Sequence, residues 1–448
     1  MDILSNPVLF LALALVLTLF TIQILRKNQA KKKYPPVAGT IFNQLLNFKR
    51  LHHYMTDLAA KYTTYRLLSP FRHEIYTSDP VNVEYILKTN FENYGKGSYN
   101  YNILKDLLGD GIFAVDGEKW RQQRKISSYE FSTKVLRDFS SLIFGKNAAK
   151  LAKILSEVAA TNQTIDIQDM SMKAILDSMF QVAFGVELDS MCGSSEEGKK
   201  FSIAFDDASA MTLFRYVDIF WKIKKILNIG AEASMKKKIK IINDFVFKII
   251  RKKIELMESS KDKSLEKVVI ELREVTKAKE VTNFVEFAET LSEEVVEKMQ
   301  YLHAAITETL RIYPAVPVDG KICLSDDKLP DGYSVRKGDL VVYQPYAMGR
   351  MKCLWGDDAE QFRPERWLNE KGVFQPQSPF KFTAFQAGPR ICLGKEFAYR
   401  QLKIFAAVLL SYFEFKLSDE KKIAHYRTMI NLHIDGGLQV CVLHRNRT

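Results

Sequence analysis

The chain is poor in cysteine and contains no paired-cysteine motif. Five cysteines are spread over its 448 residues without regular spacing, at Cys192, Cys323, Cys353, Cys392 and Cys441. An odd and scattered set argues against the disulfide framework of a small secreted domain, and the absence of CxxC pairs argues against a zinc site. We therefore expect the bulk of the chain to lie in a reducing compartment.

No extreme of composition marks the chain as disordered or fibrous. Hydrophobic residues make up 47% and charged residues 26%, a balance that suits a large globular domain. The net charge of +12 comes without any recognised nucleic-acid-binding module, so nucleic acid is not an expected partner. One basic stretch, Met235–Lys253, has apolar residues at helical spacing, which predicts an amphipathic helix with a solvated charged face. These apolar residues are Ile242, Phe245, Val246 and Ile249.

Charged residues are also absent between Ile3 and Leu25, and this uncharged stretch is long enough to cross a bilayer. Basic residues follow it at Arg26, Lys27, Lys31, Lys32 and Lys33. Since positive charge stays on the cytoplasmic side, we expect a single-pass transmembrane anchor over residues 3–25, with the rest of the chain facing the cytosol. The basic cluster suits an anionic leaflet, so membrane lipid is an expected partner. Residues 26–40, which include Pro35 and Pro36, are expected to form a basic, proline-rich linker.

The remaining residues, 41–448, are predicted to form one large domain, mainly α with a minor β portion. Two short strand-like runs, Thr64–Leu68 and His73–Thr77, come first. Asp79 and Pro80 then open a helix, because Asp caps a helix start and Pro suits its first turn.

Helical patterns dominate the middle of this domain, from residue 101 to residue 312. Strand signals return between residues 321 and 342. A long apolar helix is predicted over Phe397–Tyr412, followed by short strands to the end of the chain. This order again favours one mainly helical domain with a late β portion.

The most informative stretch runs from Phe385 to Gly394 with the sequence FQAGPRICLG. A metal at the Cys392 sulfur would explain its unusual composition. Gly388 and Gly394 permit close backbone approach and dihedral angles that other residues avoid. Backbone amides of such a loop can point at the sulfur. Arg390 favours thiolate over thiol and can bind an anionic group.

A lone cysteine is more often inert packing than a ligand, so the pattern has to be weighed against chance. Five fixed residues, each present at about one position in twenty, would coincide in about one of 10⁴ chains of this length. We therefore interpret Cys392 as a thiolate ligand of a metal. The stretch resembles the haem-binding loop of the cytochrome P450 family, FxxGxRxCxG. That resemblance makes the metal a haem iron, and its thiolate favours cleavage of the O–O bond.

Two further motifs resemble the family and follow its order along the chain. The sequence ETLR at residues 308–311 resembles the ExxR helix, and FRPERW at residues 362–367 resembles the PERF-type segment. The resemblance implies a structural ion network of Glu308, Arg311 and Arg366. Taken alone, the first two would also fit an ordinary i,i+3 pair on a helix surface.

The sequence WRQQR at residues 120–124 resembles the family's WxxxR helix. Trp120 and Arg124 lie one helical turn apart there, so both could reach a haem propionate. Lys321 stands where family members often have another basic propionate partner, and Arg390 is a further candidate. The resemblance thus implies a b-type haem ligated by Cys392 and held by these four residues. For Trp120, an ordinary position in the core stays open as an alternative.

Resemblance to microsomal members also implies an endoplasmic reticulum membrane location and electrons from NADPH-cytochrome P450 reductase. Basic residues on the two helices next to the haem are expected to form a face that docks this acidic donor. They are Arg121, Lys125, Lys395, Arg400 and Lys403.

One feature of the family is missing. Members carry a long central helix over the haem with a Gly-x-(Asp/Glu)-Thr core, whose acid–threonine pair relays protons to bound oxygen. Between Ser171 and Arg311 no such segment occurs. The nearest step, Glu289-Thr290, has no preceding glycine and lies too close to Glu308. No catalytic acid–threonine pair is therefore assigned.

Several dozen residues, including the central helix, are expected to be missing near Ser259–Ser264. A basic helix ends just before this junction, and a helix predicted over Ser264–Arg273 follows it. An alternative transcript, a mis-joined gene model or a decayed copy would each explain such a deletion. Truncating one buried leucine costs about 2–5 kcal/mol, and a whole domain is stable by only about 5–15 kcal/mol. We therefore expect this chain to fold poorly or to hold haem weakly.

The leading hypothesis is a haem-thiolate monooxygenase that uses O₂ and reductase electrons to hydroxylate a bound apolar substrate. Residues 314–321, 346–351 and 426–438 resemble plant long-chain fatty-acid ω-hydroxylases, which makes a long-chain fatty acid the expected substrate. Three alternatives stay open. They are a haem binder that cannot activate oxygen, a membrane-tethered helical protein without cofactor, and a haem-thiolate enzyme that rearranges peroxides.

Overall fold

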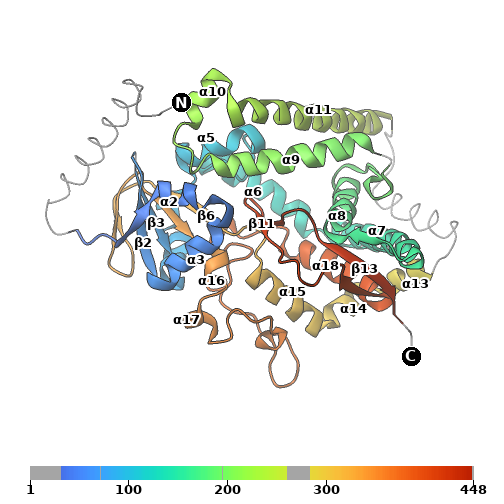
Figure 1. Cartoon of the computed structure of the whole chain (residues 1–448). Helices are drawn as coiled ribbons and strands as arrows, with labels where there is room; N and C mark the ends of the chain where they lie inside the picture. Colours follow the sequence, from blue (N-terminus) through green and yellow to red (C-terminus); the bar gives the residue numbers. More distant parts are fainter. Residues whose placement is uncertain (1–31, 71, 194, 260–282, 446–448) are drawn as a thin grey trace.

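The computed structural model of the protein describes residues 32–445 with gaps at residues 71, 194 and 260–282. The described part has two regions, a mixed sheet with short helices and a larger array of long helices (Figure 1). The predicted class, mainly α with a minor β portion, is confirmed for these residues.

The largest sheet has six strands in the order β1-β2-β3-β9-β6-β4. Its strands are β1 (Val37–Thr40), β2 (Thr64–Leu68), β3 (His73–Thr77), β4 (Tyr94–Gly95), β6 (Asp319–Cys323) and β9 (Leu340–Tyr343). The strands predicted over β2 and β3 are confirmed residue for residue. Strand β1 pairs in parallel with β2, although its residues fall in the expected linker. The sheet therefore begins before the expected boundary at residue 41.

Helix α3 (Leu51–Lys61) covers this sheet because one of its faces is apolar. Leu51, Met55 and Leu58 recur at helical spacing and pack in one core cluster with Tyr65 and Leu67 of β2. Further short helices surround the sheet or connect other elements. They are α2 (Ile41–Leu46), η3 (Phe48–Arg50), α4 (Pro80–Glu84), η4 (Tyr85–Thr89), η5 (Phe91–Asn93), η6 (Ser190–Cys192), α16 (Pro345–Met348), α17 (Lys352–Trp355), η7 (Pro364–Trp367) and η8 (Gly388–Arg390).

The helix start predicted at Asp79 and Pro80 is confirmed. Helix α4 begins at Pro80, and the Asp79 carboxylate accepts a hydrogen bond of 2.8 Å from the Val81 backbone N–H. This bond satisfies one of the backbone donors that a helix start leaves without an intrahelical partner.

Helices, most of them long, make up most of the described residues between 97 and 312, as predicted. They are α5 (Gly97–Leu108), α6 (Gly117–Ser132), α7 (Lys134–Thr161), α8 (Ile167–Phe184), α9 (Glu196–Phe214), α10 (Trp221–Leu227), α11 (Gly230–Ser259), α13 (Asn283–Thr290), α14 (Glu293–Lys298) and α15 (Gln300–Ile312). One strand, β5 (Thr164–Asp166), interrupts this helical region and was not expected. It forms because β13 (Gln439–His444), from the far end of the chain, pairs with it.

The long apolar helix predicted after Gly394 is confirmed as α18 (Lys395–Tyr412). It packs against α7 at the right of Figure 1, where Leu151 and Leu155 share a core cluster with Ile404 and Val408. The short strands predicted to follow are β10 (Phe413–Leu417), β11 (Tyr426–Arg427), β12 (His433–Ile434) and β13. Two more short strands, β7 (Asp327–Lys328) and β8 (Ser334–Val335), form a separate pair.

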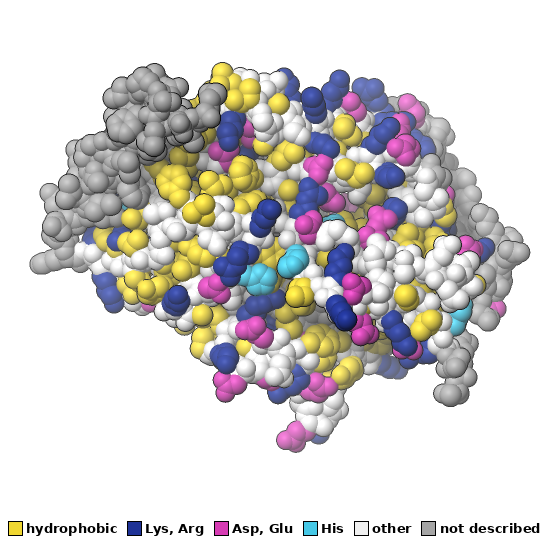
Figure 2. Space-filling model, viewed as in Figure 1, with side chains coloured by type: hydrophobic (Ala, Val, Ile, Leu, Met, Phe, Trp, Pro, Cys, Tyr) yellow, Lys and Arg dark blue, Asp and Glu magenta, His cyan; other side chains and the backbone are white. Residues whose placement is uncertain are grey.

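Helix α11 contains the predicted basic amphipathic helix. Ile242, Phe245 and Ile249 are buried on its inner face, and Phe245 stacks on Phe201 of α9 with ring centroids 4.6 Å apart. Lysine and arginine side chains gather along the upper edge of the molecule, over α11 (Figure 2). The charged face is thus the solvated one, as the pattern predicted.

Two expected segments lie outside the described residues. The anchor predicted over Ile3–Leu25 is one of them, and no helix within the described residues is long and apolar enough to cross a membrane. The helix predicted over Ser264–Arg273 is the other. Of the expected junction, only Ser259, the last residue of α11, is described.

Candidate functional site

The loop that carries Cys392 extends from Phe385 to Gly394; it contains η8 and ends where α18 begins. Its backbone folds back on itself, because the Cys392 N–H donates to the Phe385 carbonyl at 2.8 Å. The Cys392 side chain is exposed. Gly388 has a φ of +66°, and a Cβ at this position would collide with the Leu87 carbonyl of η4. Only glycine allows this loop to lie so close to η4.

Gly394 does not show the unusual backbone that we expected for it. Its φ is −85°, which any residue adopts. A Cβ at this position would make ordinary contacts, 3.6 Å from Phe131 and 4.0 Å from Cys392 Sγ. In the described structure, Gly388 is therefore the glycine that the loop geometry requires.

Arg390 is buried beside the first turn of α6. Its Nη2 donates to Asp116 Oδ1 at 2.6 Å and to the Val115 carbonyl at 3.0 Å, and its Nη1 donates to the Ile112 carbonyl at 3.4 Å. The guanidinium lies 4.4 Å from the ring centroid of Trp120. Its Nε is buried and has no hydrogen-bond partner. Burial lowers the pKa of Arg390, while Asp116 opposes this shift.

Trp120 and Arg124 lie one turn apart on α6, as the motif implied. Arg124 Nη1 donates to the carbonyl of Ile391, the neighbour of Cys392, at 2.5 Å. Trp120 is buried between Arg390 and Phe91, whose ring centroid is 5.5 Å away. Helix α6 thus places both side chains against the cysteine loop, and Trp120 also serves as a packing residue.

Lys321 lies on β6 and is 1% exposed. Its Nζ is 2.9 Å from Asp319 Oδ2 but not in hydrogen-bond geometry, so the ammonium has no hydrogen-bond partner. Burial lowers the pKa of Lys321 to about 7, although Asp319 raises it. Lys96, next to the start of α5, donates to the other Asp319 oxygen at 2.8 Å. No sequence signal had singled out Lys96 or Asp319.

The cationic side chains around the loop outnumber the carboxylates that they contact. Asp116 and Asp319 are the carboxylates, and the cations are Lys96, Arg124, Lys321 and Arg390. Arg390 Nε and Lys321 Nζ remain as buried donors without a hydrogen-bond partner, which is costly unless an anionic group accepts from them. A cysteine sulfur beside surplus cations fits a metal cofactor with carboxylate arms. Haem, with its iron and two propionates, has this chemistry.

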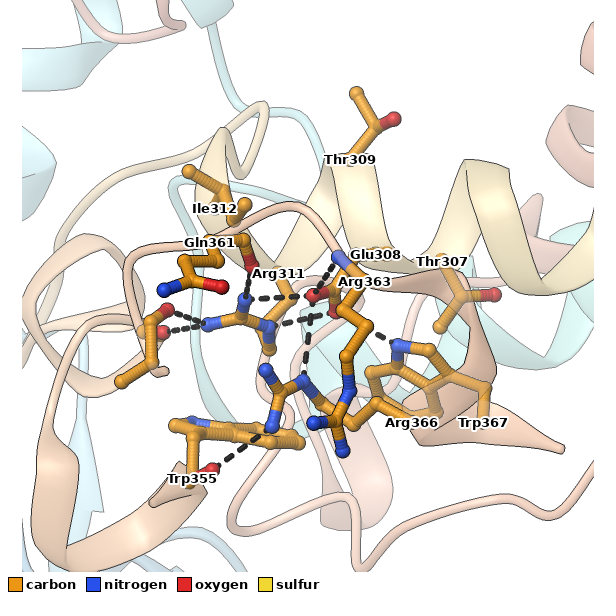
Figure 3. A network of polar contacts seen from close by, with 12 residues as sticks. Thr307, Glu308, Thr309, Arg311, Ile312, Trp355, Gln361, Arg363, Arg366 and Trp367 are labelled. Carbon is orange, nitrogen blue, oxygen red and sulfur yellow. Dashed lines mark hydrogen bonds and ion pairs between the residues drawn. The ribbon is translucent and has the colours of Figure 1, made fainter. Parts of the chain in front are cut away.

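The structure also brings Glu308, Arg311 and Arg366 together (Figure 3). Arg311 donates to both Glu308 oxygens at 2.7 Å, and Arg366 Nε donates to Oε1 at 3.3 Å. Trp367 Nε1 and the Arg363 backbone N–H complete the carboxylate's partners at 2.9 and 3.0 Å. Burial raises the pKa of Glu308, but hydrogen bonds from Arg311, Arg363 and Trp367 outweigh it, so the pKa is lowered.

This network joins α15 to a later stretch of the chain, residues 349–366. Glu308 and Arg311 are on α15, Arg366 is on η7, and Arg311 also donates to the backbone carbonyls of Gly349 and Ala359. The surface-pair alternative for Glu308 and Arg311 is therefore wrong, because both side chains are fully buried. The ExxR and PERF-type motifs hold the chain that leads into the cysteine loop.

Glu289 and Thr290, the rejected acid–threonine step, are exposed at the end of α13. The Thr290 hydroxyl donates to the Phe287 carbonyl of its own helix at 2.7 Å. Helix α13 packs on α7 and α18 through other residues, among them the buried Ala288. This geometry agrees with the rejection of that pair as an oxygen relay.

The expected basic docking face needs one correction. Lys403 is 5% exposed, and its Nζ donates to the Val296 carbonyl of α14 at 2.9 Å, so it cannot lie on a docking surface. Arg400 is half-buried and paired with Glu293 at 3.1 Å. Arg121, Lys125 and Lys395 are the more accessible members of the set. Lys403 points inward because it lies where α18 packs against α14.

A cavity of about 350 Å³ lies beside the loop and is lined mostly by apolar side chains. Gln386 of the loop forms part of its wall, and Leu51 and Met55 of α3 form another part. Leu104 of α5 and Leu213 of α9 also contribute. An apolar molecule bound there would lie next to the cysteine loop.

These features fit a protein that binds haem through a cysteine. The cysteine loop has surplus cations beside it, and a buried Glu–Arg–Arg network lies within a mainly helical fold. A family model described as Cytochrome P450 matches residues 31–279 and 277–442. The chain belongs to the cytochrome P450 family, whose members are monooxygenases that bind haem through a cysteine thiolate.

Three relatives show how far the likeness extends. Cytochrome P450 704C1 from Pinus taeda is 44% identical, with 99% of each chain covered. Cytochrome P450 704B1 from Arabidopsis thaliana is 39% identical over 94% of this chain and 96% of the relative. Cytochrome P450 94A1 from Vicia sativa is 34% identical over 93% of this chain and 90% of the relative.

The comparisons also bear on the expected gap. The alignment with the pine relative extends over 513 positions, which exceeds the 448 residues of this chain by 65. At least that many positions of the relative therefore have no counterpart here. The first family-model match ends at residue 279 and the second begins at residue 277. This boundary lies C-terminal to the expected junction at Ser259–Ser264.

Proposed function

We propose that this chain is a membrane-anchored haem-thiolate monooxygenase that hydroxylates a long-chain fatty acid. The proposal rests on the loop of Cys392, which has buried cationic donors beside it, and on the chain's membership of the cytochrome P450 family. Cys392 would ligate the iron, and Trp120, Arg124, Lys321 and Arg390 would hold the propionates. When bound, haem supplies the activation of O₂, and the chain's own residues hold and orient cofactor and substrate.

The proposed substrate rests on the sequence likeness and on where the likeness lies in the fold. The three stretches that resemble plant fatty-acid ω-hydroxylases each contribute to the wall of the apolar cavity. Val316 and Val318 come from the first stretch, Tyr346 from the second and Ile430 from the third. Because these stretches meet at one cavity, a long apolar chain is the substrate that they best support.

The proposed location and partner follow from the same family likeness. The uncharged stretch Ile3–Leu25 would anchor the chain in the endoplasmic reticulum membrane, and the domain would face the cytosol. NADPH-cytochrome P450 reductase would supply the electrons. Accessible Lys125 and Lys395 on α6 and α18 support a basic docking face next to the cysteine loop.

A second candidate function is haem binding without activation of oxygen. The positions that this chain lacks relative to the pine relative favour it. The pine relative has at least 65 positions without a counterpart here, and no acid–threonine pair stands over the haem loop within the described residues. Such a chain could keep Cys392 and the propionate partners but lack the proton relay.

The decisive test is a reduced, CO-bound difference spectrum of microsomes that contain this chain, with C392A and C353A alongside. Cys353 is an exposed cysteine on α17 and serves as the matched control. A thiolate-type band in wild type and C353A, lost in C392A, would support the haem site. Fatty-acid hydroxylation with reductase and NADPH would then separate the first function from the second. A wild-type chain without any haem band would overturn both.

A further inference from the structure

Asp116 joins the cysteine loop to the start of α5. Its carboxylate accepts from Arg390 Nη2 at 2.6 Å, from the Gly97 N–H at 2.7 Å and from the Lys96 N–H at 2.9 Å. Gly95 makes room for this arrangement, since a Cβ there would lie only 2.8 Å from Asp116 Oδ2. One carboxylate at the start of α6 therefore ties together two chain segments.

The contacts of Arg390 show what this tie does to the guanidinium. Asp116 and two backbone carbonyls occupy the Nη nitrogens, and the Trp120 ring lies against the guanidinium, 4.4 Å away. The buried Nε alone among its nitrogens is left without a partner. A charge-assisted bond of this length holds an arginine in one orientation. The unpartnered nitrogen is thus the donor that remains for an incoming anion.

We propose that Asp116 is a positioning residue for the cofactor, because it holds Arg390 with Nε free for a haem propionate. The same carboxylate holds the backbone of Lys96, whose side chain is paired with Asp319 beside Lys321. Asp116 therefore helps to position two cations of the proposed cofactor site, Arg390 through its side chain and Lys96 through its backbone. This inference rests on the proposed haem function.

Charge gives Asp116 a second effect that can be measured. Arg390 is largely buried, and Arg124 of α6 is a second guanidinium that contacts the cysteine loop. Removing the Asp116 charge would leave Arg390 without a carboxylate partner and make the surroundings of the haem more positive. A more positive site favours the reduced, less positively charged iron, so the reduction potential rises.

The experiment compares D116A, D116N and D116E with wild type, and E92Q is the matched control. Glu92 is an exposed acid that pairs with Arg121 of α6 and does not contact Arg390. Two quantities are measured: the rate of haem transfer to apomyoglobin and the reduction potential. We expect D116A to lose haem about 10–100 times faster, the range found when partners of metal ligands are removed.

The conservative variants separate positioning from mere folding. D116N keeps the size of the side chain and should shift the potential to more positive values. D116E keeps the charge, so its potential should stay near that of wild type although haem leaves faster. E92Q should match wild type in both measurements. If D116N and E92Q behave alike in potential and in haem loss, Asp116 has no positioning role.

If the wild-type chain takes up no haem, the proposed function is overturned. The link between Asp116 and Arg390 is then tested in the cofactor-free chain. Unfolding equilibrium constants of D116N, R390Q and the double variant form a cycle for this purpose. We expect the two effects to be non-additive by about tenfold, because the residues share a buried charge-assisted bond. Additive effects would overturn the link between Asp116 and Arg390.

Discussion

Arg366 Nε lies 3.3 Å from Glu308 Oε1, although 58 residues separate the two in sequence. The Glu308 carboxylate is fully buried and also pairs with Arg311, so two guanidinium groups contact one acid. Other donors of the two arginines reach the backbone carbonyls of Ala359 and Trp355, and Arg366 also pairs with the Asp358 carboxylate at 3.2 Å. The network therefore fixes the path of the chain between α15 and the segment that leads to the cysteine loop.

Replacing Glu308 by glutamine should destabilise the fold strongly. The variant leaves the buried Arg311 without its carboxylate, while Arg366 keeps Asp358 as a partner. Breaking a buried ion pair from one side costs about 3–5 kcal/mol. The free energy of unfolding, from denaturant titrations followed by circular dichroism, measures the loss. E414Q, which removes an exposed acid paired with Lys416, should change it by about 0.5 kcal/mol at most. Equal losses in both variants would contradict the assigned role of the network.

Lys321 should make the stability of the cofactor-free chain depend on pH. Its folded pKa is lowered to about 7 from the ordinary 10.5, so the unfolded chain holds more protons between these values. The free energy of unfolding should therefore rise with pH from about 7 upward. In K321Q this contribution is absent and the slope between pH 7 and about pH 9 should be smaller. K328Q, at an exposed lysine of β7, should keep the wild-type slope. Identical slopes in K321Q and wild type would refute the assignment.

Reductase docking should respond to Lys125 and not to Lys403. Charge reversal in K125E should weaken reductase binding about tenfold at low salt, because exposed charges steer association. K403Q should leave binding unchanged and lower stability instead, since Lys403 donates to a buried carbonyl. Surface plasmon resonance with purified reductase at two salt concentrations measures both effects. A loss of binding in K403Q as large as that in K125E would show that the docking face lies elsewhere.

Restoring the missing positions should improve both folding and haem binding. A chimera would carry the pine relative's unmatched segment between residues 259 and 279, the range that spans the expected junction and the break in the family match. Each buried leucine regained is worth about 2–5 kcal/mol, so a whole core helix should raise the midpoint of thermal unfolding clearly. Haem content per protein, from the CO difference spectrum, should rise with it. A flexible Gly/Ser insert of equal length is the control, and equal gains from both inserts would rule out a missing core helix.

Several elements could be predicted because their signal is local. Strands β2 and β3 match the predicted runs, since residue types that favour strands are bounded there by turn-forming residues. Helix α18 and the amphipathic α11 followed from the period of their apolar residues. Strand β5 could not be predicted, because it forms only where β13 pairs with it. Pairing between distant segments leaves little trace in either segment alone.

The candidate site divides in the same way. Cys392, Arg390, Trp120 and Arg124 could be named from short motifs, whose spacing places the side chains on one loop and one helix turn. Lys96, Asp116 and Asp319 could not be named, because each is an ordinary charged residue in its own surroundings. They become part of the site only when β6, the start of α5 and the start of α6 meet at the loop.

By itself, the sequence determined the class of this protein and predicted Cys392 as its metal ligand. A rare combination of residue types at fixed spacing is enough for that, since it needs no knowledge of distant contacts. Only the tertiary structure decided which charges face one another: that Lys403 is buried, that Glu308 holds two arginines, and that Asp116 holds Arg390. The physical reason is that electrostatic interactions depend on distance and burial, and folding sets both between residues that the chain keeps far apart.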